Sequence, residues 1–361
     1  MGKGVTNRQI FFLLLLVTCA FCTIDIPQMA AKTMGRSGWI MIVVYTAAFS
    51  LVAIMLTKLQ NTYQGMTVFE YGQILLGKVP NYIFCVVFTV YFFSILVYLN
   101  ENMAKLITMN FLPKTQPAFT LAVAVALFGF IVYKGTETMA RLFELLGVMY
   151  LAITLLLCLL MLTQSEITNI LPLYNPNEGG QFFGAILLFG TIFGGLENLM
   201  LIPFGKGNKG APKAAFFSML AIGLQLVLIT EGSIGMLGIN NAIAYNDTFI
   251  EAIKLADAPV IERPDILYIP IGLAGLFAIL TILIHSVVEL MSRIFPLAKR
   301  GLMVSLVCAA SYGASLTVLG LPAYSSEFKK ILPVLMLFFA GVMPTLLFLL
   351  SLLKKRSKTG G

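Results

Sequence analysis

Charged residues are scarce in this chain. Asp, Glu, Lys and Arg together make up 11% of the 361 residues, whereas about a quarter of a soluble globular protein is charged. Apolar residues make up 59%, and the mean hydropathy is +0.92. This composition excludes an ordinary soluble domain and indicates a chain that crosses a membrane several times. The net charge of +8 does not predict a nucleic-acid partner, because the basic residues lie between apolar runs.

Groups that carry chemistry are also few. His285 is the only histidine, which excludes a metal site built from several histidines, and the five cysteines all lie in apolar runs, where cysteine packs as a small apolar residue. Cys19 and Cys22 have the spacing of a redox or metal pair, but there is no second such pair. The sequence has no phosphate-binding glycine loop, nucleophile elbow or zinc-ligand spacing. We therefore expect no enzymatic activity, no metal and no cofactor.

Long uncharged runs are abundant instead. About 20 apolar residues in a helix cross the ~30 Å hydrocarbon core of a bilayer. No small-residue cleavage site follows the first run, so we expect no cleavable signal peptide. With ten membrane spans, sixteen of the 24 Lys and Arg residues fall on one side of the membrane. Basic residues favour the cytoplasmic side, so both termini are predicted to be cytoplasmic. The expected ten spans are 8–34, 38–58, 79–105, 115–134, 138–163, 180–204, 212–238, 265–292, 299–320 and 330–353.

The first span is interrupted. Its uncharged run from Gln9 to Ile24 leads into Asp25, and Pro27 follows. A charge near mid-depth costs roughly 3 kcal/mol, and proline lacks the N–H that a continuing helix needs. The sequence therefore predicts a broken helix with a carboxylate at the break. Asp25 would line a binding site or cap the helix that follows the break.

The sixth span is interrupted at a matching position. A shift of about 171 residues aligns Phe11 with Phe182 and places Asp25 beside Glu197. The glycines of the run 190–195 weaken a helix by roughly 1 kcal/mol each, and Gly194 and Gly195 would free backbone groups for a ligand or allow close helix packing. Two interrupted spans at equivalent depths are typical of transporters built from inverted repeats.

This pattern predicts an all-α integral membrane protein with a single transmembrane domain over 1–361. Its two inverted repeats would cover roughly 7–163 and 180–353. The segment 240–264 is long and mildly amphipathic, so we expect it to form helices over the outer mouth.

The third span carries a polar stripe. Tyr91, Ser94, Tyr98, Glu101 and Lys105 recur at the spacing of one helix face. In lipid such a face must contact protein or a water-filled path. We expect it to line the site and its outer access; the alternative is hydrogen bonding between helices.

Spans seven and eight contain ionisable residues. Glu231 interrupts the seventh, and His285 and Glu289 lie four residues apart in the eighth. Together with Glu101 they are candidates for a proton or ion path, or they form neutralised structural pairs.

Five short motifs resemble the permease-type B subunit of the germinant receptors of spore-forming bacteria, a branch of the amino acid–polyamine–organocation superfamily. The resemblance covers about residues 5–350. The motifs are Gly65-Met66-Thr67-Val68-Phe69-Glu70-Tyr71, Phe111-Leu112-Pro113, Lys134-Gly135-Thr136-Glu137 with Ala140, Arg141 and Glu144, Asn169-Ile170-Leu171-Pro172, and Gly195-Leu196-Glu197.

This resemblance implies a LeuT-like fold of ten helices in the spore inner membrane. It also implies a complex with a larger A subunit and a lipoprotein C subunit, and recognition of a small nutrient germinant. The first break departs from the superfamily, because it lacks glycine between Ala20 and Pro27. The pocket implied by the resemblance includes the middle of span eight and the residues Thr23, Ile24, Asp25, Tyr91, Ser94, Tyr98, Gly194, Gly195, Leu196, Glu197 and Leu199.

The function that we expect from the sequence is nutrient sensing. An amino acid or similar molecule would bind at the midplane between the broken first and sixth helices, and partner subunits would receive the signal. Two alternatives remain open at this point. One is a proton-coupled amino acid transporter that works without partners, and the other is a ligand-gated ion channel.

Overall fold

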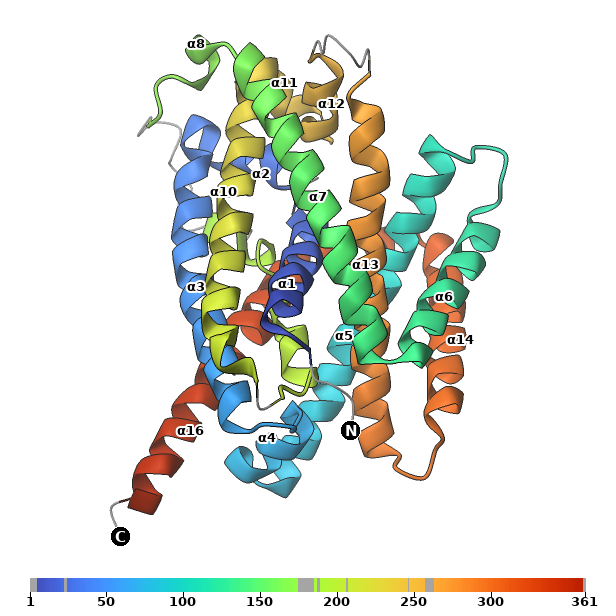
Figure 1. The fold of residues 1–361 in the computed structure, drawn as a ribbon. Helices are drawn as coiled ribbons and strands as arrows, with labels where there is room; N and C mark the ends of the chain where they lie inside the picture. The colour runs from blue at the N-terminus through green and yellow to red at the C-terminus, as the bar shows by residue number, and fades with distance from the viewer. Residues whose placement is uncertain are drawn as a thin grey trace.

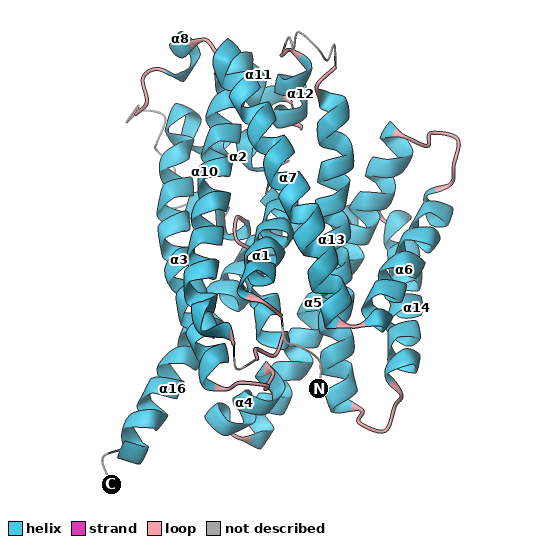
Figure 2. Cartoon of the chain, in the orientation of Figure 1, coloured by secondary structure: helices cyan, strands magenta, loops and turns pink. Residues whose placement is uncertain are grey.

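The computed structural model describes residues 5–22, 25–174, 185–186, 189–205, 207–245, 247–256 and 263–359. Over these residues the chain forms helices and loops, with no β-strand (Figure 2). The α-helices are α1 (Asn7–Cys22), α2 (Asp25–Met34), α3 (Gly38–Thr62), α4 (Val68–Leu76), α5 (Lys78–Asn110), α6 (Pro117–Lys134), α7 (Thr136–Gln164), α8 (Ile167–Ile170), α10 (Ala211–Leu237), α11 (Ile239–Ala244), α12 (Thr248–Lys254), α13 (Asp265–Ile294), α14 (Arg300–Leu319), α15 (Pro322–Met336) and α16 (Met343–Thr359). The other helical elements are the 3₁₀ turns η1 (Gly35–Ser37), η2 (Phe189–Thr191), η3 (Leu196–Leu201) and η4 (Asn208–Gly210), and the π-helix η5 (Leu337–Val342).

Most of the predicted spans are long apolar helices. The first and sixth are different: α1 has 16 residues, and the described part of the sixth contains 3₁₀ turns. The total of ten spans therefore stays a prediction. The eight helical stretches in the described part of the chain that are long and apolar enough to cross a membrane are Ile26–Thr62, Lys78–Thr108, Pro117–Lys134, Thr136–Gln164, Asn208–Leu237, Ile266–Ile294, Arg300–Leu319 and Glu327–Lys355.

The first helix lies at the centre of the bundle. α1 packs against α10, α7 and α13, and α3 packs along α10 (Figure 1). α5, α6 and α14 form a second group, joined to the first through α13. Side chains from α1, α3, α5, α10 and α13 share one continuous buried apolar core. Residues of α1 are therefore surrounded by protein. Inside a membrane protein, polar groups are tolerated in such positions because protein, and not lipid, surrounds them.

The two ends of the bundle differ. Both termini and α4 lie at one end, whereas α8, α11 and α12 lie at the other (Figure 1). The predicted outer segment 240–264 thus contains the short helices α11 and α12, and residues 246 and 257–262 lie outside the described residues. At the α4 end, Arg293 at the end of α13 binds Glu70 of α4 at 2.8 Å. Lys354 of α16 donates a hydrogen bond to the Ile74 carbonyl of α4.

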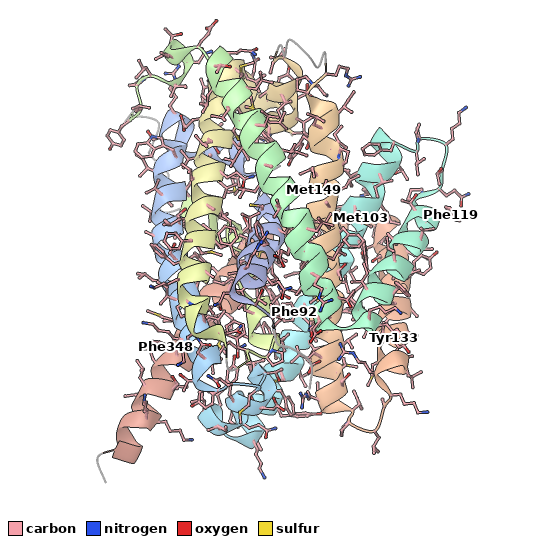
Figure 3. All side chains as sticks on the ribbon, in the orientation of Figure 1. Phe92, Met103, Phe119, Tyr133, Met149 and Phe348 are labelled. Atoms are coloured by element: carbon pink, nitrogen blue, oxygen red, sulfur yellow. The ribbon has the colours of Figure 1, made fainter. Side chains whose placement is uncertain are left out.

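The outer surface of the bundle is apolar. Phe119 and Tyr133 of α6 and Met149 of α7 project away from the helices, and they are 65%, 60% and 46% exposed (Figure 3). Phe92 of α5, by contrast, is fully buried. Large apolar side chains pointing outward from every side of a bundle suit a lipid environment, because lipid tails are as apolar as the side chains themselves.

Candidate functional site

Two helices flank the predicted first interruption. α1 covers Asn7–Cys22, and α2, which covers Asp25–Met34, packs against α10 and α11. Pro27 is the third residue of α2, where its missing N–H leaves no helix bond unmade. Thr23, Ile24 and the side chain of Asp25 lie outside the described residues. The predicted break thus falls outside the described residues, and both the break and the role of Asp25 stay predictions.

The second interruption centres on two glycines. Between residues 189 and 201 the chain makes η2, a turn and η3, and Gly195 has a φ of +100°, a conformation that side-chain-bearing residues avoid. A Cβ atom at Gly195 would lie 2.6 Å from Val17 Cγ1 of α1, and one at Gly194 would lie 2.7 Å from Met336 Sδ of α15. These glycines interrupt the regular winding and allow close packing against α1 and α15; that they free backbone groups for a ligand stays a prediction.

Glu197 links this interruption to α5. Its side chain is 1% exposed, and it accepts a hydrogen bond from the Tyr91 hydroxyl at 2.7 Å. Its second carboxylate oxygen accepts the N–H of Gly195 at 2.9 Å. The Tyr91 ring stacks on Phe339 of η5 at 4.2 Å. The structure thus brings together two residues that the sequence assigned to the site from separate spans.

Asn198 links the same segment to α13. Its Nδ2 donates to the carbonyl of Gly195 at 3.0 Å, and its Oδ1 accepts the Ser286 hydroxyl at 2.7 Å. On the opposite side, Gln60 of α3 donates to the carbonyl of Leu199 at 2.5 Å. Side chains therefore satisfy several of the peptide groups that the irregular winding leaves without helix bonds.

Sequence reasoning did not select Asn198, Ser286 or Gln60. The available signal was weak, because an amide or hydroxyl in an apolar span is common where helices touch. Asn198 directly follows Glu197, and Ser286 directly follows His285. Leu196 and Leu199, which were selected, are fully buried in the core.

The polar stripe of α5 does not face one site along its whole length. The Ser94 hydroxyl donates to the carbonyl of Val90 in its own helix at 2.8 Å. The Tyr98 ring packs on Phe328 of α15, with ring centroids 5.3 Å apart. Tyr91, by contrast, is hydrogen-bonded to Glu197 of the interrupted segment.

Glu101 lies further along α5 and contacts α15. Its side chain is fully buried, Lys105 pairs with one carboxylate oxygen, and the Ser325 hydroxyl donates to the other. Tyr98 and Glu101 therefore join α5 to the first half of α15. This is a contact between helices, which is the alternative that the sequence left open for the stripe.

The remaining candidates for an ion path are separated in the fold. His285 is 2% exposed, and its Nε2 has no hydrogen-bond partner among the described residues; the same holds for both carboxylate oxygens of Glu231. Glu289 instead pairs with Arg293 at 3.4 Å, in the group that includes Glu70 at the α4 end. The described hydrogen bonds do not connect His285 with Glu289.

The site as a whole offers acceptors, donors and apolar walls. η3 presents a carboxylate to a hydroxyl of α5 and an amide to a hydroxyl of α13, and the ring of Phe339 stacks on Tyr91 of the first pair. Within the described residues there is no group of three or more His, Cys, Asp or Glu residues that could hold a metal ion. Buried carboxylate, amide and hydroxyl groups are of the kind that hold a small polar molecule through hydrogen bonds.

The structure is similar to solved transporters. It matches the nucleobase-cation-symport-1 family transporter Mhp1, solved in a closed conformation with bromovinylhydantoin bound, with a TM-score of 0.67 at 14% identity over 96% of this chain and 78% of that chain. It matches MhsT in complex with L-phenylalanine with a TM-score of 0.63 at 15% identity over 97% of this chain and 89% of that chain. The predicted all-α, LeuT-like fold is confirmed.

Curated proteins of Bacillus subtilis (strain 168) are similar in sequence. The chain is 21% identical to the spore germination protein YndE over 295 residues, which cover 81% of each chain. It is 23% identical to the spore germination protein B2 over 248 residues, or 67% of each chain.

The family model described as "Spore germination protein" matches residues 4–320. Together with the transporter-like fold, this match indicates a non-enzymatic, multi-pass integral membrane protein. The chain belongs to the spore germination permease family.

Proposed function

We propose that this protein is the germinant-sensing membrane subunit of a spore nutrient receptor. A small nutrient, an amino acid or a similar molecule, binds near the midplane between the break that follows α1 and the segment 189–201. Binding is signalled to a larger A subunit and a lipoprotein C subunit. The protein lies in the spore inner membrane with both termini in the cytoplasm.

The observation that carries this proposal is the pair of buried hydrogen bonds made by η3. Glu197 binds Tyr91 of α5, and Asn198 binds Ser286 of α13. The interrupted segment is thereby attached to two regular helices by side chains and not by apolar packing alone. A polar ligand can compete for these groups, since each bond can be exchanged for one to the ligand at small net cost.

The arrangement indicates how binding becomes a signal. A ligand amine or hydroxyl that bonds to Glu197 would displace the Tyr91 hydroxyl, which would loosen the link between η3 and α5. α1 would follow, because Val17 packs directly against Gly195. A ligand shifts such an equilibrium only by binding one arrangement more tightly than the other. Solved structures of the same fold hold L-phenylalanine and bromovinylhydantoin, which supports a small molecule of similar size as the ligand.

Ligand-induced thermal stabilisation tests the proposal. The purified full chain is screened against a panel of amino acids, sugars and nucleosides, and the midpoint of thermal denaturation is measured. We expect one class to raise the midpoint of the wild type and not that of Glu197→Gln. Glu137→Gln is the matched control, because Glu137 is paired with Arg141 on an exposed helix face. A panel without effect on the wild type contradicts the proposal.

Germination of spores provides the second measurement. We expect Glu197→Ala to abolish the nutrient response while the protein still inserts into the membrane. We expect the same of Tyr98→Ala, since Tyr98 helps to hold α15 against α5. Unchanged germination with either variant would argue against this pocket.

A secondary carrier is the second candidate. It is favoured by buried polar atoms that have no hydrogen-bond partner among the described residues, namely both oxygens of Glu231, Nε2 of His285 and the side-chain amide of Asn100. Buried polar groups of this kind are usually satisfied by water or an ion. Proton-coupled uptake of an amino acid into proteoliposomes by this chain alone would support the carrier, and ion flux without substrate exchange would support a ligand-gated channel.

A further inference from the structure

A deep apolar groove lies on the surface between α3 and α16. Its volume is about 550 Å³, and apolar residues line it almost throughout. In Figure 1, α16 diverges from the bundle toward the C-terminus, and Phe348 lies where α16 still meets α3 (Figures 1 and 3). The residues that line the groove are Ala48, Phe49, Val52, Leu337, Gly341, Val342, Thr345, Leu346, Leu349, Leu350 and Leu353.

The groove is longer than the hydrocarbon part of one leaflet, so an extended acyl chain fits along it. Its wall runs from Leu337 to Leu353, which is about 24 Å at ~1.5 Å per residue. A single leaflet contributes about half of the ~30 Å hydrocarbon core. A helix of this length and about 10 Å across would fill roughly 1,900 Å³, which exceeds the groove more than threefold. An extended acyl chain is far thinner, and its length lies along the groove.

The chain becomes strongly basic where the groove ends. Lys354 and Lys355 directly follow the last lining residue, Leu353, and Arg356 and Lys358 come next in the sequence. A cluster of basic residues immediately beyond a membrane helix attracts anionic lipid headgroups. The groove therefore combines an apolar wall that can cover one leaflet with positive charge next to its last lining residue.

The floor of the groove touches the interrupted segment. Phe49 lines the groove and stacks on Phe193 with ring centroids 5.2 Å apart. The π-helix η5 forms part of the wall, and π-helical turns are frequent at functional sites. Its Phe339 stacks on Tyr91, the partner of Glu197. An occupant of the groove is thus separated by Phe49 from Phe193 of the segment 189–201.

We propose that this groove is a binding site for an anionic phospholipid. One acyl chain lies against Phe49 and Gly341, and the headgroup lies beside the basic residues at the end of α16. Through Phe49 and η5 the bound lipid supports the arrangement of the segment 189–201. The proposal does not depend on which nutrient the protein senses or on whether it senses one.

Native mass spectrometry of the purified full chain tests this site. The protein is equilibrated with phosphatidylglycerol or phosphatidylcholine, and retained lipid is counted. We expect one phosphatidylglycerol to be retained in preference to phosphatidylcholine. Lys355→Gln should weaken this retention about fivefold, because each basic residue near the surface contributes to headgroup binding.

Gly341→Leu tests the groove itself. A Cβ at Gly341 meets Phe49 and Leu337 only at ordinary contact distances of 3.7 and 3.8 Å, so a larger side chain extends into the groove without a clash at its base. We expect this variant to lose the lipid. Gly313→Leu on α14 is the control that keeps it, because a Cβ at Gly313 meets nothing within 4 Å. If Gly341→Leu does not fold, Leu349→Trp fills the groove from its exposed rim.

Three outcomes would overturn the proposal. The first is equal retention of both lipids by the wild type, which would remove the role of the basic residues. The second is full retention by Gly341→Leu or Leu349→Trp. The third is cross-linking of a photoreactive residue at position 349 to a protein instead of a lipid in spore membranes, which would show that the groove holds a helix of another chain.

Discussion

The polar contacts at the centre of the bundle and those at the α4 end use similar groups but differ in burial. Tyr91 and Glu197 are 4% and 1% exposed, whereas the paired side chains of Arg293 and Glu70 are 39% and 32% exposed. A buried hydrogen bond is hard to replace with water, and an unmade one is costly. An exposed ion pair gains little and is screened by salt. The centre therefore fixes one arrangement, and the α4 end exchanges partners at low cost.

This difference suits a protein that responds to a small molecule. A ligand that supplies new hydrogen bonds at the centre can compensate for those it breaks, so the centre is selective. The pairs at the α4 end, such as Arg293 with Glu70 at 2.8 Å, can break and re-form as the helices shift. The predictions below measure this contrast in order of decreasing effect.

The strongest test changes the backbone of the centre. Gly195→Ala places a side chain in a left-handed conformation and against Val17, so we expect it to destabilise the protein by about 2–5 kcal/mol. Gly313→Ala in α14 is the matched control, and it should leave stability unchanged or raise it by up to about 1 kcal/mol. Thermal denaturation in detergent, followed by size-exclusion chromatography, compares the two. Equal midpoints for both variants would show that the turn at Gly195 is not required.

The second test removes one buried donor. Tyr91→Phe deletes the hydroxyl that binds Glu197 and keeps the ring on Phe339, so we expect a loss of about 1.5–3 kcal/mol. Tyr82→Phe on the same helix is the control, because Tyr82 is 49% exposed, and it should change stability by less than about 0.5 kcal/mol. The same denaturation assay measures both. A loss as small as that of the control would mean that Glu197 is held by Gly195 alone.

Much of this centre could be predicted from the sequence. Asp25 with Pro27, and Gly194 with Gly195, are incompatible with continuous membrane helices for reasons that act locally, through charge and backbone geometry. Glu197 could be selected because an acid in an apolar span must face protein. These inferences need no knowledge of the neighbouring helices. The interruption at 189–201 lies where it was predicted, whereas the first falls outside the described residues.

The partners of these residues could not be predicted. Helical periodicity shows which residues share a face, but not which helix covers that face at each depth. The stripe of α5 is an example: Tyr91 meets η3, whereas Tyr98 and Glu101 meet α15. The role of Ser286 as the partner of Asn198 depends on the packing of α13, which no local pattern specifies.

The third test concerns that partner. Ser286→Ala leaves Oδ1 of Asn198 without its donor, and we expect a loss of about 0.5–1.5 kcal/mol. Ser305→Ala, at an exposed position of α14, is the control and should have no effect. If the centre acts as a unit, combining Ser286→Ala with Tyr91→Phe should cost less than the sum of the two single losses. Strict additivity would instead indicate two independent contacts.

The smallest expected effect is at the α4 end. Arg293→Gln breaks the exposed pairs with Glu70 and Glu289, which should cost less than about 1 kcal/mol. The deciding measurement is its salt dependence, because the screening length falls from about 10 Å at 0.1 M to about 3 Å at 1 M salt. The difference between Arg293→Gln and wild type should shrink over this range, whereas the difference for Tyr91→Phe should persist. If the loss of stability in Arg293→Gln does not change with salt, its ion pairs are shielded from solvent. The α4 end would then hold one arrangement as firmly as the centre does.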